Sequence, residues 1–153
     1  MALSDLVASQ AVTPALKVSN KKQLLQELAQ RAATLTGQSE RELFECLMQR
    51  EKLGSTAVGN GIAIPHCKLP KLTRLFGLFA RLDRPIDFDA LDGQPVDLVF
   101  LLLAPEGAGA DHLKALARVA RLLRDADIAT RLRESRDAEA IYAVLTMPMT
   151  GIP

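Results

Sequence analysis

The chain has 153 residues, 48% of them hydrophobic and 24% charged, which is the composition of one globular domain with a sizeable core and excludes a disordered chain. Its 19 lysines and arginines nearly balance 18 aspartates and glutamates, so charge gives no reason to expect binding to nucleic acid or to an anionic membrane surface. The N-terminus lacks a signal-peptide pattern, and no apolar run reaches the ~18 residues of a membrane span. We therefore expect a single cytoplasmic domain over residues 1–153, without membrane insertion.

The N-terminal segment suggests a short helix and then a strand. Residues 4–9 suit a short helix. The segment AVTPALKV, residues 11–18, suits a strand that Pro14 breaks, because proline lacks the N–H that a sheet uses.

Two amphipathic helices are expected next. Ser19 or Asn20 can cap the first, which runs to about Thr34. Ser39 and Glu42 form a capping box for the second. Their predicted core faces are Leu24, Leu25, Leu28 and Ala32 in the first helix and Leu43, Phe44, Leu47 and Met48 in the second. The glycines that end them are Gly37 and Gly54.

The middle of the chain changes to strand patterns. Short strands are expected in STAVG (55–59) and GIAIP (61–65), and RLFGLFARL (74–82) suits a longer strand followed by a turn at Pro85. The segment PVDLVFLLLAP (95–105) is a nearly continuous apolar run, which indicates a central strand buried on both faces. Helices must therefore cover both sides of the sheet.

The last third predicts three helices. The longest lies in residues 107–125, where Asp111 can serve as a cap, and two shorter helices follow at 127–135 and 137–145. The apolar stripe expected for the long helix is Leu113, Leu116, Ala117, Ala120 and Leu123. The arginines expected on water-facing helix surfaces, with a partner-docking surface as the alternative, are Arg118, Arg121, Arg124, Arg131, Arg133 and Arg136. The fold class is thus α/β, a mixed β-sheet flanked by helices on both faces, with a flexible tail at 146–153.

The stretch GNGIAIPHCK contains the first candidate for chemistry, His66. Pro65 restricts the backbone before it, while Gly59 and Gly61 permit sharp turns, so the ring is expected at a strand end where α/β folds present ligand-binding groups. An imidazole there can act as a base, a metal ligand or a nucleophile toward phosphorus. A histidine that only forms a hydrogen bond at a strand edge is the alternative.

Three further features could join His66. His112 lies near a predicted helix start, where free N–H groups favour a phosphoryl group, although such a residue can also simply face water. Arg50 lies one helical turn before a loop of small residues and could bind an anion with two N–H groups. The loop residues that could supply hydroxyl and N–H groups to that anion, or form an ordinary turn, are Ser55, Thr56, Asn60 and Gly61.

Other chemistries match the sequence poorly. A zinc site from His66, Cys67 and His112 would need a further ligand. The loop lacks the order of a P-loop, and Ser55 lacks the nucleophile-elbow motif of a serine hydrolase. Cys46 suits a core thiol, and the sequence leaves a disulfide with Cys67 open, although a reducing compartment is simpler.

Three segments carry a family resemblance. REKLGSTAVGNGIAIPHCK (50–68), PIDFDALDGQPVDLVFLLLAP (85–105) and HLKALARVARLL (112–123) resemble the IIA proteins of the sugar phosphotransferase system, in the fructose–mannitol group. The likeness is greatest to the nitrogen-regulatory, PtsN-type branch, and it runs from about residue 4 to residue 145. Cys67, where relatives often have a small residue, is a minor variation.

The resemblance implies a phosphocarrier. In this family the histidine at the position of His66 accepts a phosphoryl group at Nε2 from the phosphohistidine of an HPr-like carrier, His112 is the second active-centre histidine, and Arg50 is the active-site arginine. No cofactor or metal is implied, because the donor is another protein. The donor is expected to dock on an apolar surface that includes Ile62, Ile64 and Leu69.

The resemblance also implies partners and leaves alternatives. Regulatory targets of the family include potassium-transport and sensor-kinase components. Instead of regulating targets, the chain could be a free-standing IIA subunit that passes phosphate to a fructose- or mannitol-type IIB protein. It could also be an interaction module whose histidine is no longer phosphorylated.

Overall fold

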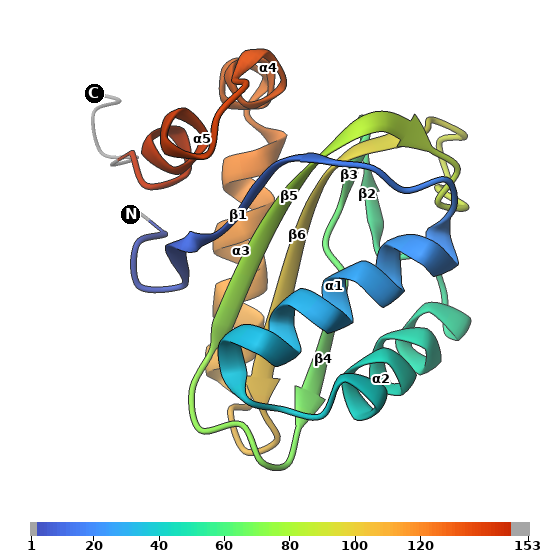
Figure 1. Ribbon diagram of the computed structural model, residues 1–153, viewed down its shortest axis with the longest axis vertical. Helices are drawn as coiled ribbons and strands as arrows, with labels where there is room; N and C mark the ends of the chain where they lie inside the picture. Colours follow the sequence, from blue (N-terminus) through green and yellow to red (C-terminus); the bar gives the residue numbers. More distant parts are fainter. Residues whose placement is uncertain (1–2, 148–153) are drawn as a thin grey trace.

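The computed structural model describes residues 3–147, which form five helices and one six-stranded mixed sheet (Figure 1). The strands are β1 (Val7–Leu16), β2 (Ala57–Gly59), β3 (Ile62–Ala63), β4 (His66–Leu69), β5 (Phe76–Ile86) and β6 (Val96–Pro105). The helices are α1 (Lys21–Thr36), α2 (Glu40–Lys52), α3 (Ala110–Arg124), α4 (Ala126–Glu134) and α5 (Ala138–Leu145). No helix within this part of the chain is long and apolar enough to cross a membrane.

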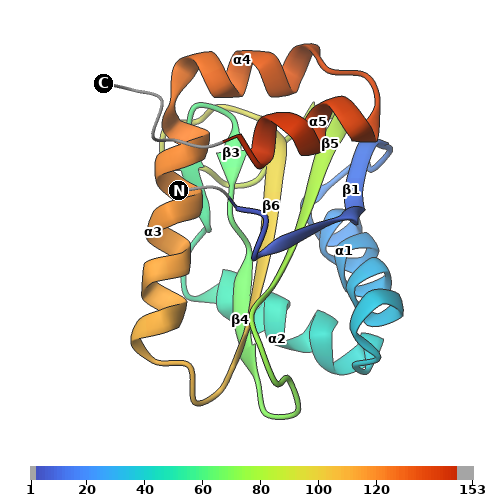
Figure 2. The same ribbon diagram turned by 90° about the vertical axis from the view of Figure 1, so that its left-hand side faces the viewer.

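Strand β6 is the centre of the sheet. It pairs with antiparallel β5 on one side, and with β3 and then β4, both parallel, on the other. Strand β1 lies parallel to β5 at one edge of the sheet. Figure 2 shows α3 on one face of the sheet and α1 and α2 on the other. From Val96 to Ala104 every residue except Asp97 is buried, which confirms the predicted central strand and mixed sheet.

The two predicted N-terminal helices are confirmed with their caps. The Asn20 side chain accepts a hydrogen bond from the backbone N–H of Gln23 at 2.8 Å and begins α1. The Ser39 hydroxyl accepts one from the N–H of Glu42 at 3.2 Å and begins α2. The predicted core-face residues that are fully buried are Leu24, Leu25, Leu28, Ala32, Leu43 and Leu47. Phe44 and Met48 are half-buried and pack against this core.

The predicted helix at residues 4–9 is wrong. A turn spans residues 4–6, in which the N–H groups of Leu6 and Val7 both donate to the carbonyl of Leu3, and β1 begins directly after it at Val7. Pairing with β5 therefore overrides the local helical pattern of a short segment.

Two prolines expected to interrupt or end a strand lie inside one, each at an irregularity of the pairing. Pro14 lies inside β1, an edge strand that tolerates a missing N–H, at a register shift between Thr13 and Leu16. Pro85 lies inside β5, at a register shift between Arg81 and Ile86 where the β6 ladder is irregular.

The predicted apolar stripe of α3 is partly correct, since Leu123 is buried and Leu116 and Ala120 pack half-buried against the core. The buried residues are His112, Ala115, Val119, Leu122 and Leu123. Leu113 has 68% of its surface exposed, and Ala117 is exposed as well. The helix carries two overlapping apolar stripes, and only the sheet decides which one faces inward. Asp111 is not the cap, because the N-cap is Gly109 without a side-chain bond.

Two of the arginines expected to face water are bound within the protein instead. Arg118 forms a bidentate ion pair with Asp5, with N–O distances of 2.8 and 3.1 Å. Arg133 binds the carboxylate of Asp97 and donates to the carbonyl of Asn60 at 2.7 Å. Of the expected tail at 146–153, residues 148–153 lie outside the described residues.

Gly77→Ala is expected to destabilise the sheet, since Gly77 packs directly under the Phe100 ring. A Cβ at this position would lie 2.7 Å from the ring and 2.9 Å from the carbonyl oxygen of Leu6. We expect a loss of roughly 1–3 kcal/mol in the free energy of unfolding, measured by chemical denaturation. The matched control is Gly107→Ala, where nothing lies within 4 Å of the added Cβ. Equal stability of the two variants would contradict the prediction.

Candidate functional site

His66 lies where a strand is interrupted. The predicted strand GIAIP ends at Ala63, and the chain leaves the ladder at Ile64 and Pro65. His66 then begins β4 on the same side of β6, paired with Leu102. It therefore starts a strand of its own instead of following the end of the preceding one, because Pro65 has no N–H with which to continue the ladder.

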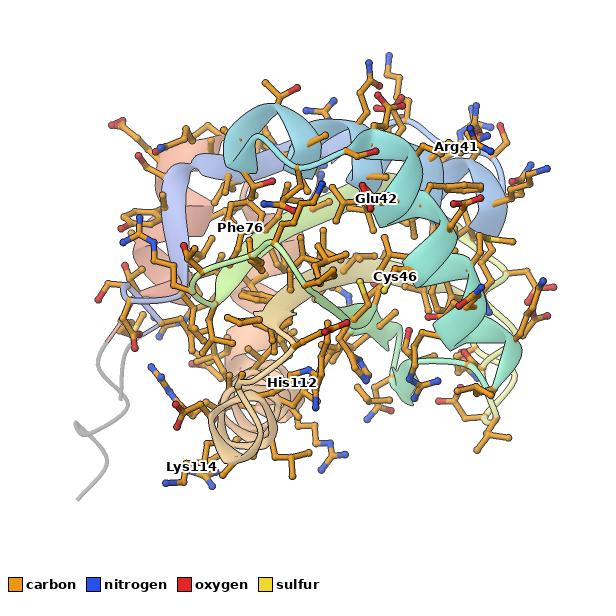
Figure 3. All side chains as sticks on the ribbon, turned by 90° about the horizontal axis from the view of Figure 1, so that it is seen from below. Arg41, Glu42, Cys46, Phe76, His112 and Lys114 are labelled. Atoms are coloured by element: carbon orange, nitrogen blue, oxygen red, sulfur yellow. The ribbon has the colours of Figure 1, made fainter. Side chains whose placement is uncertain are left out.

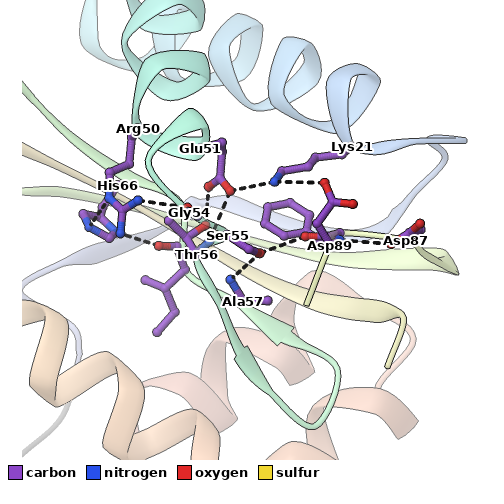
Figure 4. Close-up of polar contacts among 12 residues, drawn as sticks. Lys21, Arg50, Glu51, Gly54, Ser55, Thr56, Ala57, His66, Asp87 and Asp89 are labelled. Carbon is purple, nitrogen blue, oxygen red and sulfur yellow. Dashed lines mark hydrogen bonds and ion pairs between the residues drawn. The ribbon is translucent and has the colours of Figure 1, made fainter. Parts of the chain in front are cut away.

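The His66 ring is held at both nitrogens, as Figure 4 shows. Its Nδ1 lies 2.8 Å from the carbonyl oxygen of Ile64, and its Nε2 lies 3.3 Å from Nε of Arg50. A carbonyl oxygen can only accept, and a guanidinium can only donate. The ring therefore carries its proton on Nδ1, and the lone pair on Nε2 points toward Arg50.

The surroundings keep His66 neutral. Burial lowers its pKa below the ordinary value of 6.5, and the positive charge of Arg50 lowers it further. The hydrogen bond to Ile64 and the carboxylate of Glu51 act in the opposite direction but do not outweigh burial. At neutral pH the ring is thus an uncharged base whose Nε2 lone pair accepts a hydrogen bond from Arg50.

His112 faces His66 from the first turn of α3. The two rings are edge to face, with their centroids 5.6 Å apart. His112 is buried, and within the described residues its Nε2 has no hydrogen-bond partner. Burial lowers its pKa, and the neighbouring His66 and Lys68 add to this effect. Seen from below in Figure 3, His112 and Cys46 approach this end of β4 from α3 and α2.

Arg50 is anchored by the end of α2. Besides Nε2 of His66, its guanidinium binds the carbonyl of Gly54 at 3.0 Å. The next residue, Glu51, is almost fully buried and accepts hydrogen bonds from the N–H and hydroxyl of Thr56. Its carboxylate also lies 2.9 Å from the ammonium of Lys21, which packs over the ring of Phe88 (Figure 4).

Sequence reasoning missed Glu51 and Lys21. They lie 30 positions apart in the sequence, and each has a simple interpretation as a surface charge on a helix. No local signal distinguishes them, because their contact arises only when α1 and α2 pack together.

The structure splits the predicted loop into two parts. Thr56 lies beside the site, since its carbonyl accepts from the N–H of Ile64 at 3.0 Å. The Ser55 hydroxyl donates to the carbonyl of Phe88 at 2.8 Å. The hydroxyls of Ser55 and Thr56 are thus both hydrogen-bonded within the protein, the latter to Glu51.

Asn60 and Gly61 lie at the other end of the β2–β3 hairpin. The Asn60 N–H donates to Asp92, and Gly61 precedes Ile62, which pairs with Leu98 of β6. His66 pairs four residues further along β6, which corresponds to roughly 13 Å. The structure does not bring these two residues to the His66 ring.

An open depression of about 440 Å³ surrounds the exposed edge of His66. The residues that line it are Cys46, Gln49, Arg50, Leu53, His66, Cys67, Lys68 and His112. Among these residues, Leu53 is an apolar side chain with 84% of its surface exposed. The predicted docking surface is wrong, because Ile62, Ile64 and Leu69 are buried.

Arg50→Gln is expected to raise the pKa of His66, because it removes the positive charge that opposes protonation of the ring. The protonated fraction of His66 at a given pH should rise accordingly. Titration of the His66 Cε1–H signal by NMR measures it. The exposed Arg41→Gln on the same helix is the control, and an unchanged His66 titration in Arg50→Gln would contradict the assigned contact.

Comparison with known proteins agrees with this geometry. The family model described as "Phosphoenolpyruvate-dependent sugar phosphotransferase system, EIIA 2" matches residues 5–147, and the chain belongs to this family. It is 75% identical over 148 residues to a nitrogen regulatory protein of Bradyrhizobium diazoefficiens, with 97% of each chain covered.

Solved structures extend the comparison to the fold. The crystal structure of nitrogen regulatory protein IIA-Ntr from Neisseria meningitidis has a TM-score of 0.89 and 36% identity, covering 94% of this chain and 99% of that one. Mannitol IIA from Escherichia coli, at 18% identity, shares the fold with a TM-score of 0.77, covering 91% of this chain and 98% of that one. The chain is thus a IIA protein similar to the nitrogen-regulatory, PtsN-type group.

Proposed function

We propose that this IIA protein is a phosphocarrier in which Nε2 of His66 accepts a phosphoryl group from the phosphohistidine of an HPr-like protein. The observation that carries the proposal is the hydrogen bond between Nδ1 of His66 and the carbonyl of Ile64. That bond fixes the tautomer whose nucleophilic lone pair lies on Nε2, at the open depression. The lowered pKa keeps the ring neutral at neutral pH, as a nucleophile must be.

In the transfer, a new bond forms between Nε2 of His66 and phosphorus as the N–P bond of the donor phosphohistidine breaks. The transition state is loose, so the protein contributes mostly in-line positioning and stabilisation of charge on the phosphoryl oxygens. Before the transfer, Arg50 donates a hydrogen bond to the Nε2 lone pair of His66. It must turn aside as phosphorus approaches, and its guanidinium can then bind the phosphoryl oxygens.

His112 is placed to assist the same group. Its Nε2 is buried and has no partner among the described residues, a state that costs free energy and calls for an explanation such as a functional role. A neutral His112 with its proton on Nε2 can donate a hydrogen bond to a phosphoryl oxygen. Thr56 contributes as a support, since both its hydroxyl and its N–H are bound to Glu51.

Phosphorylation by phosphoenolpyruvate, enzyme I and an HPr-like carrier tests the proposal. The full chain should gain the mass of one phosphoryl group, and the gain should be acid-labile and alkali-stable, as expected for phosphohistidine. Peptide mapping should place it on residues 53–68. No gain with a carrier that phosphorylates another IIA protein would overturn the proposal and would favour an interaction module that is not phosphorylated.

We further propose that the phosphorylation state of His66 regulates target proteins in the cytoplasm, such as potassium-transport or sensor-kinase components. The similarity to proteins named nitrogen regulatory protein supports this role. The alternative, transfer of phosphate to a fructose- or mannitol-type IIB protein, is supported by the sugar-system description of the family. Mixing the phosphorylated chain with such IIB proteins decides between them, since rapid transfer to a IIB cysteine would favour sugar uptake.

A further inference from the structure

Two cysteines lie against the phosphoryl-acceptor candidate, and the proposed chemistry uses neither. Cys67 follows His66 on β4 and is buried, whereas Cys46 on α2 is half-buried. Both line the depression beside His66. The Cys46 Sγ lies 3.5 Å from the carbonyl oxygen of Lys68, so its thiol lies directly on β4.

The two thiols are chemically unequal. Hydrogen bonding between them lowers the pKa of Cys46 and raises that of Cys67, and burial raises the pKa of Cys67 further. Cys46 is therefore the thiol that ionises more readily, and it is also the more exposed of the two. Cys67 is protected from an oxidant by its burial, but it lies next to the Cys46 thiol. An accessible attacking thiol beside a buried second thiol is the arrangement of an oxidisable pair.

We propose that Cys46 and Cys67 form a reversible intramolecular disulfide when the protein meets a peroxide, and that this bond slows phosphoryl uptake by His66. The second half of the proposal rests on the proposed function, while the first half does not. Within the described residues these are the only cysteines, so the pair has no competing partner in the same molecule.

The chemistry balances with hydrogen peroxide as the oxidant. The Cys46 thiol loses its proton to water, and its thiolate attacks one peroxide oxygen. The O–O bond breaks and hydroxide leaves, which gives a sulfenic acid on Cys46. The Cys67 sulfur then attacks the Cys46 sulfur, the S–O bond breaks, and the departing hydroxide leaves as water with the proton of Cys67. Two thiols are oxidised by two electrons, and one peroxide is reduced to two waters.

The disulfide would act on the site because it joins the two elements that build it. Cys46 precedes Arg50 by one helical turn on α2, and Cys67 is next to His66 on β4. Arg50 donates to Nε2 of His66 at 3.3 Å and must turn aside before phosphorus can approach. A covalent link between α2 and β4 would keep the Arg50 guanidinium hydrogen-bonded to Nε2 of His66, the nucleophile. The oxidised protein should therefore accept phosphate slowly.

The first measurement concerns the bond alone. The full chain, treated with a small molar excess of hydrogen peroxide, should lose about 2 Da and both free thiols. Trypsin should release peptides 42–50 and 53–68 joined by the disulfide, and a dithiol reductant should separate them. Cys46→Ala and Cys67→Ala should each fail to form the bond. Disulfide-linked dimers, or sulfinic acid on Cys46 without a disulfide, would overturn the proposal.

The second measurement concerns the effect of the disulfide on the rate of phosphoryl uptake. Phosphorylation by the HPr-like carrier should be at least about tenfold slower for the oxidised chain, since misplacing reacting groups by about 1 Å can cost up to roughly 100-fold. Reductant should restore the rate. Cys46→Ala should be phosphorylated at a rate insensitive to peroxide, and equal sensitivity of wild type and Cys46→Ala would overturn the coupling. If the reduced chain takes up no phosphate at all, the proposed function fails, while the mass measurement still decides on the disulfide.

Discussion

A chain carrying His66→Ala is expected to take up no phosphoryl group. In the part of the chain that the structure describes, Nε2 of His66 combines a lone pair fixed by its tautomer with access to the depression, and its removal deletes the nucleophile. The rate of uptake from the phosphorylated HPr-like carrier should fall by more than about 1,000-fold, to background. Mass spectrometry of the intact chain after incubation with the complete donor system measures this. Labelling that persists in the variant would sink the assignment of His66.

His112→Ala tests whether the second histidine assists phosphoryl transfer to His66. His112 is near His66 but its ring is buried and contributes no accessible nucleophile. Uptake should be slower than in the wild type, by roughly 10- to 1,000-fold if His112 stabilises charge on the phosphoryl oxygens, but labelling of His66 should continue. If His112→Ala abolished labelling while His66→Ala did not, the roles of the two histidines would be reversed.

The parts of the fold that the sequence predicts correctly are those with a strong local signal. The caps at Asn20 and Ser39 and the continuous apolar run of β6 each follow from short-range chemistry, and all three are confirmed. The errors occur where tertiary contacts decide. Residues 7–9 of the predicted helix at 4–9 join an edge strand through pairing with β5, and α3 turns Leu113 and Ala117 of its predicted stripe away from the sheet.

The candidate site shows the same division. Side-chain chemistry and the family resemblance single out the two histidines and the arginine from the sequence, and the fold brings His66, His112 and Arg50 together. The sequence carries no comparable signal for which atoms contact the rings and the guanidinium of these residues. Which nitrogen of His66 carries the proton depends on a carbonyl two residues earlier, and the strand break at Pro65 is what aims that carbonyl at the ring.

The expected docking surface is wrong for a related reason. Ile62, Ile64 and Leu69 belong to strand patterns beside the histidine, and apolar strand residues next to a central strand are drawn into the core. Large apolar side chains left on the surface include Leu53, just after α2, and Leu113, on the face of α3 that the sequence pattern assigns to the core. A partner that contacts His66 would meet Leu53, which lines the same depression.

Glu51→Ala is expected to be the most destabilising change near the site. The Glu51 carboxylate is almost fully buried and satisfies three donors: the N–H and hydroxyl of Thr56 and the ammonium of Lys21. Its removal leaves the N–H and hydroxyl of Thr56 without this acceptor, and leaves Lys21 with the longer, 3.6 Å ion pair to the exposed carboxylate of Asp89. We expect a loss of about 2–4 kcal/mol in the free energy of unfolding, measured by urea denaturation.

The control lies on the same helix. Glu45 is exposed and its ion pair with Arg41 is long, at 3.8 Å, so Glu45→Ala should change the stability by less than about 0.5 kcal/mol. Replacing Lys21 by Met in the Glu51→Ala background should recover part of the loss, because it removes a largely buried ammonium that has lost its 2.9 Å ion pair. If Glu51→Ala were as stable as Glu45→Ala, the buried network would not hold the end of α2 to the loop.

Glu51 also has an effect that a purely structural residue would lack. Its negative charge favours protonation of His66, whereas the positive charge of Arg50 disfavours it. Glu51→Gln should therefore lower the pKa of His66, and Arg50→Gln should raise it. Opposite shifts from two neighbouring substitutions cannot come from a general loosening of the fold, because loosening exposes the ring and moves its pKa upward, toward 6.5, in both variants. NMR titration of His66 in the two variants thus separates the electrostatic influence of the α2 terminus on the nucleophile from its contribution to stability.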